Sequence, residues 1–229
     1  MNNVNIFCLL ARSGGGKSTI YNEILEDSFF CFHNDISPMI YGTTRKPRDG
    51  ERDGVEYYFH TMEEFNNIPP DDLIEFRSYY KWDEKEVKYF TKKEYLEGKT
   101  NIICTCSPYQ FIYYFNWCNK ENAKNGDNKY RVYCIEISCN ARERLLRTIE
   151  RVPENENDDA IYEICRRILD EILEFNGAMK KLPFSNNNNL IDKDYTNYIL
   201  KIDNSSRDRN DFVDQINKVK YFISSHIDD

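Results

Sequence analysis

The chain has 229 residues, which is enough for one domain with insertions or for two small domains. Its 39 acidic residues outnumber its 31 basic residues, and the net charge of −8 argues against a surface that grips nucleic-acid phosphates or an anionic membrane throughout. An anionic ligand therefore needs local positive charge. Because 40% of the residues are hydrophobic, the composition also excludes wholesale disorder.

The beginning of the chain has no positive segment before its short apolar run, so we expect no signal peptide. No stretch approaches the roughly 20 apolar residues of a membrane span. These features predict a cytoplasmic protein that binds neither a membrane nor nucleic acid. The eight cysteines form no Cys-x-x-Cys pair, and several lie in apolar, strand-like runs. We therefore expect reduced core cysteines and no structural zinc.

Short apolar runs alternate with amphipathic stretches along most of the chain, a pattern typical of an α/β fold with a mainly parallel sheet. Strands are predicted over residues 4–10, 102–106, 130–137 and 198–202, and helices over 17–26, 108–119, 141–150, 160–175 and 210–225. Polar stretches at 119–129, 153–159 and 186–189 are predicted loops.

Residues 40–98 differ from this alternation and are predicted to form a small inserted subdomain. They hold short strand-like pieces at 55–59 and 73–76, with one helix between them that begins at the capping box of Thr61 and Glu64. Residues 91–94 repeat the capping pattern, and Gly98 is expected to end the helix that follows.

The most specific motif is the glycine loop at residues 11–19, which follows a predicted strand and opens a predicted helix. In such a loop, backbone N–H groups converge on phosphate without side chains in the way, and the helix adds its positive dipole end. The predicted ATP-binding residues are Ser13, Gly14, Gly15, Gly16, Lys17, Ser18 and Thr19. Lys17 would reach the β- and γ-phosphates and Ser18 would bind Mg²⁺. The alternative is a glycine-rich turn without a ligand, and Ala11 stands where the first glycine of the motif is usual.

A second basic segment lies at residues 43–52, where four positive charges gather in an acidic chain. Arg45 and Arg48 flank Pro47, which stiffens the turn, so the two guanidinium groups suit a bidentate grip on phosphate. The alternative is a solvated basic loop, which is what most charge clusters are.

Together the two segments resemble the guanylate kinase family. The residues that match the family's basic motif and its continuation are Thr43, Thr44, Arg45, Pro47, Arg48, Gly50, Glu51, Asp53, Gly54, Val55, Tyr57 and Phe59. The resemblance implies a P-loop three-layer α/β/α fold with an inserted nucleoside monophosphate-binding subdomain and a helical lid. It divides the chain into a core (1–39, 99–140 and 176–229), an insert (40–98) and a lid (141–175).

The resemblance also implies roles for individual side chains. Arg45, Arg48 and Tyr57 would hold the acceptor phosphate, Glu75 would accept from guanine, and Tyr89 and Thr91 are looser counterparts of acceptor-site residues. Arg144, Arg147 and Arg167 are the lid arginines expected to contact the transferred phosphoryl group, beside Lys17 and Arg45. Asn204, or equally Asp203, would lie near the donor base.

The chain departs from the family pattern at several positions. Tyr41 replaces a serine that helps to recognise the base, and the segment after Glu75 is longer than the family's. Cys104 and Cys106 replace two aspartates that help to organise Mg²⁺ and the acceptor, and thiols are poor ligands for this hard ion. The lid has Arg151-Val152-Pro153 where the family has Arg-Gly-Thr.

The sequence thus predicts an ATP-dependent kinase that phosphorylates GMP or dGMP, with ATP and Mg²⁺ as cofactors. Two alternatives stay open. One is the same reaction on another nucleoside monophosphate. The other is a guanylate kinase-like binding module that has lost catalysis.

Overall fold

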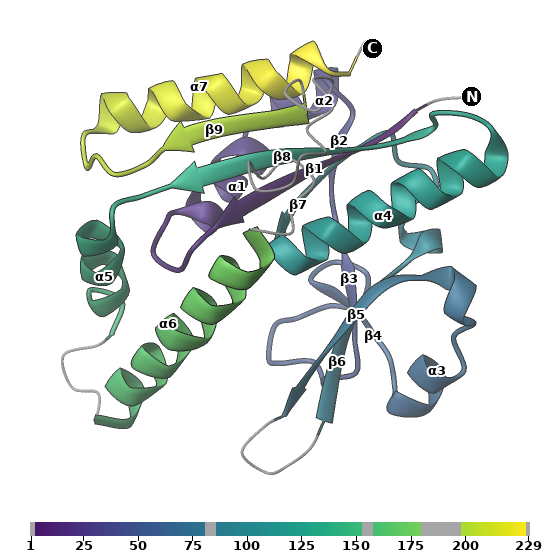
Figure 1. Ribbon diagram of the computed structural model, residues 1–229, viewed down its shortest axis with the longest axis horizontal. Helices are drawn as coiled ribbons and strands as arrows, with labels where there is room; N and C mark the ends of the chain where they lie inside the picture. Colours follow the sequence, from purple (N-terminus) through teal and green to yellow (C-terminus); the bar gives the residue numbers. More distant parts are fainter. Residues whose placement is uncertain (1–2, 81–85, 153–157, 180–197, 228–229) are drawn as a thin grey trace.

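The computed structural model describes residues 3–80, 86–152, 158–179 and 198–227 (Figure 1). A five-stranded sheet forms its centre. The strands are β1 (Val4–Ala11), β2 (Ile36–Pro38), β7 (Asn101–Cys106), β8 (Tyr130–Ser138) and β9 (Ile199–Asp203), in the order β2-β7-β1-β8-β9. All four pairings are parallel. Every residue of β1 is buried, as expected for the middle strand of a parallel sheet that is covered on both faces.

Helices cover the two faces of this sheet because its side chains alternate between them. Helix α4 (Pro108–Asn125) packs on the face of Ile6 and Cys8. Helices α1 (Lys17–Glu26) and α7 (Arg209–Ser225) pack on the face of Phe7 and Leu9, and α2 (Ser28–His33) adds Phe30 at the margin. The predicted three-layer α/β/α architecture with a mainly parallel sheet is confirmed.

A second, four-stranded sheet is built from residues 41–92. Its strands are β3 (Tyr41–Thr43), β4 (Tyr57–Phe59), β5 (Leu73–Tyr80) and β6 (Glu86–Lys92), in the order β4-β3-β6-β5. Its own small core gathers Phe65, Phe90 and Tyr95. Helix α3 (Met62–Asn66) and the short 3₁₀ turns Pro70–Asp72 and Lys93–Leu96 complete this part. The predicted capping box is present, with Thr61 accepting from the Glu64 N–H.

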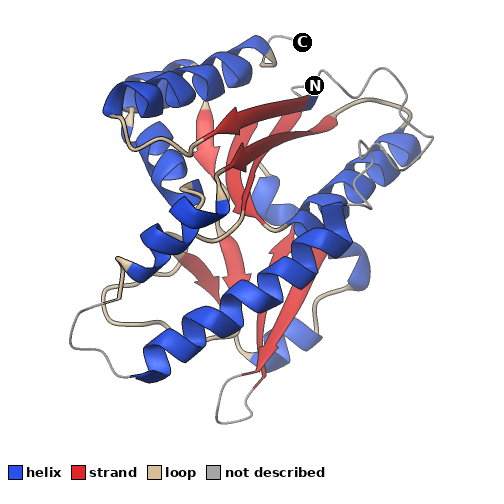
Figure 2. Ribbon diagram, turned by 60° about the vertical axis from the view of Figure 1, so that its left-hand side comes forward, coloured by secondary structure: helices blue, strands red, loops and turns tan. Residues whose placement is uncertain are grey.

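Two helices extend from the carboxyl edge of the central sheet. Helix α5 (Ala141–Ile149) begins at Asn140, whose side chain accepts from the Glu143 N–H. Helix α6 (Asp158–Met179) follows, and in Figures 1 and 2 it projects to the same side of the central sheet as the second sheet. None of the helices in the described ranges is both long and apolar enough to cross a bilayer.

Several predicted elements need correction. Thr91 does not cap a helix, because it lies in β6 with its hydroxyl bonded to Glu75, and only a 3₁₀ turn follows. Helix α4 continues through the predicted polar loop to Asn125, where Gly126 ends it at a positive φ of 69°. Residues 153–157 and 186–189 of the predicted loops lie outside the described residues. Elements α2, β2, β3 and β6 were not individually predicted.

The close contact between β3 and β6 gives a test of this packing. Gly42 lies opposite Phe90, whose ring is fully buried, and a Cβ at Gly42 would overlap that ring. We expect Gly42→Ala to lower the free energy of unfolding by about 1–3 kcal/mol, since overpacking displaces the ring. Chemical denaturation measures this value.

Gly177→Ala on α6 is the matched control, because its nearest neighbour is the Tyr109 hydroxyl at 3.3 Å, the movable end of a side chain. Alanine favours a helix, so the control should be neutral or gain up to about 1 kcal/mol. Equal losses in the two variants would contradict the packing described for Gly42.

Candidate functional site

The loops that follow four parallel strands meet at the carboxyl edge of the central sheet. The glycine loop follows β1, Ser107 follows β7, α5 follows β8, and Asn204 follows β9. In open parallel sheets this edge is where ligands bind, because the strand ends diverge there and helix N-termini face the opening.

The glycine loop turns sharply into α1. Gly14 and Gly16 have φ values of 73° and 91°, which side chains rarely adopt, and the Gly15 N–H donates to the Arg12 carbonyl at 2.9 Å. Gly16 precedes α1, and no side chain among the described residues caps the helix there. The N–H groups of the first turn are therefore available to an anion.

Neighbouring elements are in close contact with this loop. A Cβ at Gly16 would overlap the Asn204 amide, and one at Gly14 would overlap the Arg144 carbonyl. The buried Asn204 side chain donates to the Gly15 carbonyl at 3.0 Å, and the Arg144 guanidinium donates to the Ser13 carbonyl at 3.5 Å. Both predicted residues thus contact the loop backbone.

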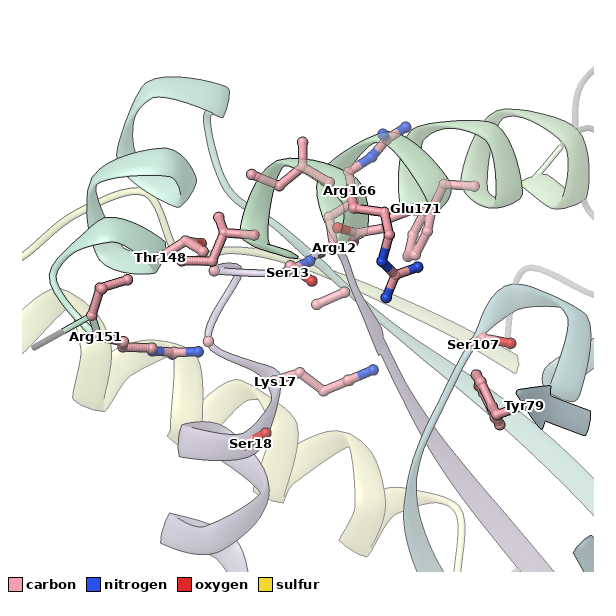
Figure 3. A pocket seen from close by; sticks show the side chains of 17 residues that line it. Arg12, Ser13, Lys17, Ser18, Tyr79, Ser107, Thr148, Arg151, Arg166 and Glu171 are labelled. Atoms are coloured by element: carbon pink, nitrogen blue, oxygen red, sulfur yellow. Dashed lines mark hydrogen bonds between the residues drawn. The ribbon is translucent and has the colours of Figure 1, made fainter. Parts of the chain in front are cut away.

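A cavity of about 800 Å³ opens in front of the loop. Lys17 and Ser18 line one wall, while Tyr79 from β5 and Ser107 line another (Figure 3). The Lys17 ammonium donates to the Cys106 carbonyl at 3.4 Å. The cavity therefore joins the glycine loop to the second sheet.

Helix α6 forms a further wall of the cavity and contacts the loop. The Glu171 carboxylate accepts a hydrogen bond from the Ser13 N–H. Arg12 donates to the Asn176 side chain at 3.0 Å and lies over the Phe175 ring at 5.0 Å. A negatively charged side chain thus accepts the hydrogen bond of a loop N–H group of the kind that binds phosphate.

The predicted lid arginines are not in one place. Arg147 donates to the Glu143 carboxylate and the Ser206 carbonyl, and with Thr19 and Asn204 it lines a second cavity of about 460 Å³. The side chain of Arg167 lies outside the described residues. Arg166 and Arg151 line the first cavity instead. Sequence reasoning missed them because the register of the lid helices could not be read from arginine spacing alone.

Arg45 is the centre of the second group of charged residues. Its guanidinium pairs with both Glu51 oxygens at 2.7 and 2.9 Å, and its Nε donates to the Tyr89 hydroxyl at 3.3 Å. The Tyr57 ring lies 5.1 Å away, within cation–π range. Arg45, Tyr57 and Tyr89 are therefore brought together as predicted neighbours.

The ion pair shifts the titration of both partners. Hydrogen bonds from Arg45 and from the Arg48 N–H lower the pKa of Glu51 to about 2, and the Glu51 carboxylate raises the pKa of Arg45. The exposed Arg48 side chain forms no ion pair with the other described residues. Glu51 thus fixes the turn while the Arg48 guanidinium remains available.

Glu75 is buried between β5, β6 and α4. Its Oε1 accepts from Thr91 at 2.9 Å and from Gln110 at 3.3 Å, and the Thr91 hydroxyl also bonds Tyr114 at 2.9 Å. Its Oε2 has no hydrogen-bond partner in the described part of the chain, and the nearest charge is Arg77, 3.9 Å away. Burial raises the pKa of Glu75.

Two further side chains bear on the predicted base-binding site. The Tyr41 hydroxyl donates to the Thr105 carbonyl at 3.0 Å, so it bonds the core backbone rather than Glu75. Gln110 was missed, although Ser107 and Gln110 form a capping box at the start of α4 that the sequence displays. That signal places Gln110 in the first helical turn but does not predict its contact with Glu75.

Comparisons with known proteins agree with the predicted resemblance. The "Guanylate kinase" family model matches residues 3–94. Guanylate kinase of Latilactobacillus sakei subsp. sakei (strain 23K) is 45% identical over 75 residues, which are 32% of this chain and 35% of that protein. Guanylate kinase of Clostridium perfringens (strain 13 / Type A) is 42% identical over 92 residues, 40% of each chain. The chain thus spans well under half the length of these curated relatives.

The solved structure of guanylate kinase from Anaplasma phagocytophilum resembles the whole fold, with a TM-score of 0.51 over 98% of this chain and 86% of that one. Its sequence identity is 16%, so this likeness concerns the fold alone. The resemblance to guanylate kinases is therefore confirmed in sequence for the segment that holds the glycine loop, Arg45 and Glu75.

The Arg45–Glu51 pair predicts a pH-dependent contribution to stability. The pKa of Glu51 is about 2 in the folded protein against an ordinary 4.5, so its stabilising effect is present above about pH 5 and is lost as the pH falls toward 2. We expect Glu51→Gln to unfold at a lower temperature than the wild type at pH 7, with the difference shrinking below pH 5. The exposed Glu97→Gln is the control and should shift stability by less than about 0.5 kcal/mol at any pH. A pH-independent deficit in Glu51→Gln would contradict the ion-pair explanation.

The Glu171 contact predicts competition at the loop. Glu171→Ala frees the Ser13 N–H and removes a negative charge, so we expect pyrophosphate and ATP to bind about tenfold more tightly by calorimetry. Glu171→Asp keeps the charge but shortens the reach, and it should also tighten binding if occupation of the N–H matters. Unchanged affinity in Glu171→Ala would rule out the competition.

Proposed function

We propose that this protein is an ATP-dependent nucleoside monophosphate kinase of guanylate kinase type, acting on GMP or dGMP in the cytoplasm. The observation that carries the proposal is the 800 Å³ cavity that joins the glycine loop, with Lys17 and Ser18, to Tyr79 of the second sheet. The similarity of residues 3–94 to guanylate kinases supports the same reading. Phosphoryl transfer requires such an arrangement, since donor and acceptor must face each other in line.

The donor side consists of the glycine loop and the start of α1. The uncapped N–H groups would bind the phosphates of ATP, and Lys17 would approach the β- and γ-phosphates. The second cavity, lined by Asn204, Thr19 and Phe212, adjoins the loop and would accept the nucleoside part of the donor.

The acceptor side lies on the second sheet. Arg48 and the Arg45–Tyr57–Tyr89 group would hold the acceptor phosphate, because guanidinium and hydroxyl donors suit its oxygens. Glu75 would accept from the N1 and N2 hydrogens of guanine, which would supply partners for the unpaired Oε2. Thr91 and Gln110 already hold Oε1 and so would orient the carboxylate.

The transfer itself needs positioning and neutralisation of charge rather than a covalent intermediate. Lys17, with arginines of α5 and α6 such as Arg144 and Arg166, would face the moving phosphoryl group. Arg147 and Arg167 remain candidates for contacting the phosphoryl group. Arg147 would approach it from the second cavity and Arg167 from α6. Closure of α6 and the second sheet would exclude water, so that ATP is not simply hydrolysed.

Magnesium fits the donor side only in part. The exposed Ser18 hydroxyl at the loop is an oxygen ligand of the required kind, and Mg²⁺ commonly takes its other ligands from phosphates and water. Bound with ATP, the ion would neutralise phosphate charge. Strand β7 offers the thiols of Cys104 and Cys106 near its end rather than carboxylates. Of the glycine loop and β7, Ser18 alone therefore supplies a suitable ligand for Mg²⁺.

Two alternatives are favoured by particular observations. Tyr41 stands where the family has a serine that helps to recognise the base, which favours a different acceptor base within the same reaction. The thiols at the end of β7 favour a binding module that retains the loop without turnover. One set of assays distinguishes both alternatives from the main proposal.

The test measures ADP release from Mg-ATP with GMP, dGMP, AMP, dTMP, UMP and CMP offered in turn. We expect turnover with GMP or dGMP, and a loss of at least about 10²-fold in kcat in Lys17→Ala, because a donor to the developing charge is removed. Turnover with another base would support the first alternative. No ADP release with any of the six acceptors, with ATP still bound, would support the binding module.

A matched pair of variants tests the acceptor site. Arg45→Ala should raise KM for the acceptor strongly, whereas Lys46→Ala, an exposed neighbour, should leave it unchanged. Tyr41→Ser tests the base: an unchanged preference across the panel would count against a role for Tyr41.

A further inference from the structure

Three cysteines converge inside the central sheet, and the proposed phosphoryl transfer assigns a role to none of them. Cys8 lies on β1, and Cys104 and Cys106 lie on the neighbouring strand β7, where Cys104 is in register with Cys8. Their sulfur atoms all lie within 4.8 Å of one another, and those of Cys8 and Cys104 are 3.5 Å apart. Residues almost a hundred positions apart in the chain thus form one cluster of three thiols.

The cluster is closed from solvent but lies next to the cavity. All three side chains are buried on the sheet face that α4 covers. Cys106 is the last residue of β7, its carbonyl accepts from the Lys17 ammonium at 3.4 Å, and the next residue, Ser107, lines the cavity. Strand β7 thus ends at the cavity, next to the cluster.

We propose that Cys8, Cys104 and Cys106 form a binding site for one monovalent copper ion, Cu(I), held by three thiolates. With metal–sulfur bonds of about 2.3 Å, three sulfurs around one ion lie about 4 Å apart. The Cys8 and Cys104 sulfurs are 3.5 Å apart and all three pairs lie within 4.8 Å, so small side-chain adjustments suffice to reach this spacing. This inference is independent of the kinase proposal.

The number and kind of ligands select the metal. Thiolates are soft ligands that favour Cu(I) or zinc over Mg²⁺ or Ca²⁺. Structural zinc is almost always bound by four residues, and within the described ranges no further histidine, cysteine or carboxylate joins these three sulfurs within the same distance. Three-coordinate Cu(I) fits this set better than zinc does.

The charges in the bound state can be counted. Binding breaks three S–H bonds, releases three protons and forms three Cu–S bonds, so the site carries a charge of −2. The Lys17 ammonium beside Cys106 is positioned to offset part of that charge. Because protons are released, copper should bind more weakly as the pH falls.

The test titrates the 229-residue chain, kept anaerobic and reduced with ascorbate, against the coloured Cu(I)–bicinchoninate complex. We expect the wild type to take one equivalent of Cu(I), and X-ray absorption of that sample to report three Cu–S bonds. Cys104→Ser should weaken binding by more than about 100-fold. The matched control is Cys134→Ser, a buried cysteine on β8 also in register with Cys8 but outside the cluster, and it should bind like the wild type.

Several outcomes would overturn the proposal. They are no uptake by the wild type, equal uptake by Cys104→Ser, equal loss in Cys134→Ser, and a one-equivalent zinc complex that Cu(I) does not displace. Circular dichroism verifies that each variant is folded. If Cys104→Ser does not fold, Cys106→Ala provides the comparison, and retained uptake in that variant would be equally decisive against the site.

Discussion

The structure depends on the parallel pairing of β1 with β7 on one side and β8 on the other. Parallel strands bring their carboxyl ends to one edge, so the glycine loop, Ser107, α5 and Asn204 meet although they are distant in sequence. The loop then has no space for side chains at Gly14 or Gly16, because α5 and Asn204 already contact its backbone. The geometry of the loop is therefore a property of the whole sheet edge rather than of the glycines alone.

The two sheets are tied together by polar contacts at the start of α4. Gln110 both completes the capping box of α4 and donates to Glu75 in β5, while Tyr41 of β3 bonds the Thr105 carbonyl of β7. A buried carboxylate with several donors on one oxygen is held firmly, since leaving a donor unpaired in the interior is costly. These contacts anchor the second sheet at its end nearest the central sheet, and its far end near Tyr79 faces the cavity.

The sequence was sufficient where local signals and burial agree. The β1–loop–α1 unit was predicted closely because a fully buried strand, positive-φ glycines and an amphipathic helix follow one another directly. The sequence was misleading at Thr91. A helix-capping pattern begins there, but the residue lies in strand β6 and bonds Glu75 across the sheet. The sequence was insufficient for the lid arginines, because which of them reach the cavity depends on how α5 and α6 pack, and spacing carries no such information. The contact of Gln110 with Glu75 likewise arises only from tertiary structure.

The hydrogen bond between Glu171 and the Ser13 N–H has a thermodynamic consequence for anion binding. A phosphate that takes this N–H must displace the carboxylate, so anion binding and the Glu171–Ser13 contact are linked equilibria. Linkage is reciprocal: whatever breaks the Glu171–Ser13 contact strengthens anion binding, and a bound anion favours the broken contact to the same extent. The apparent affinity then equals the intrinsic affinity reduced by the fraction of molecules in which the loop is uncovered.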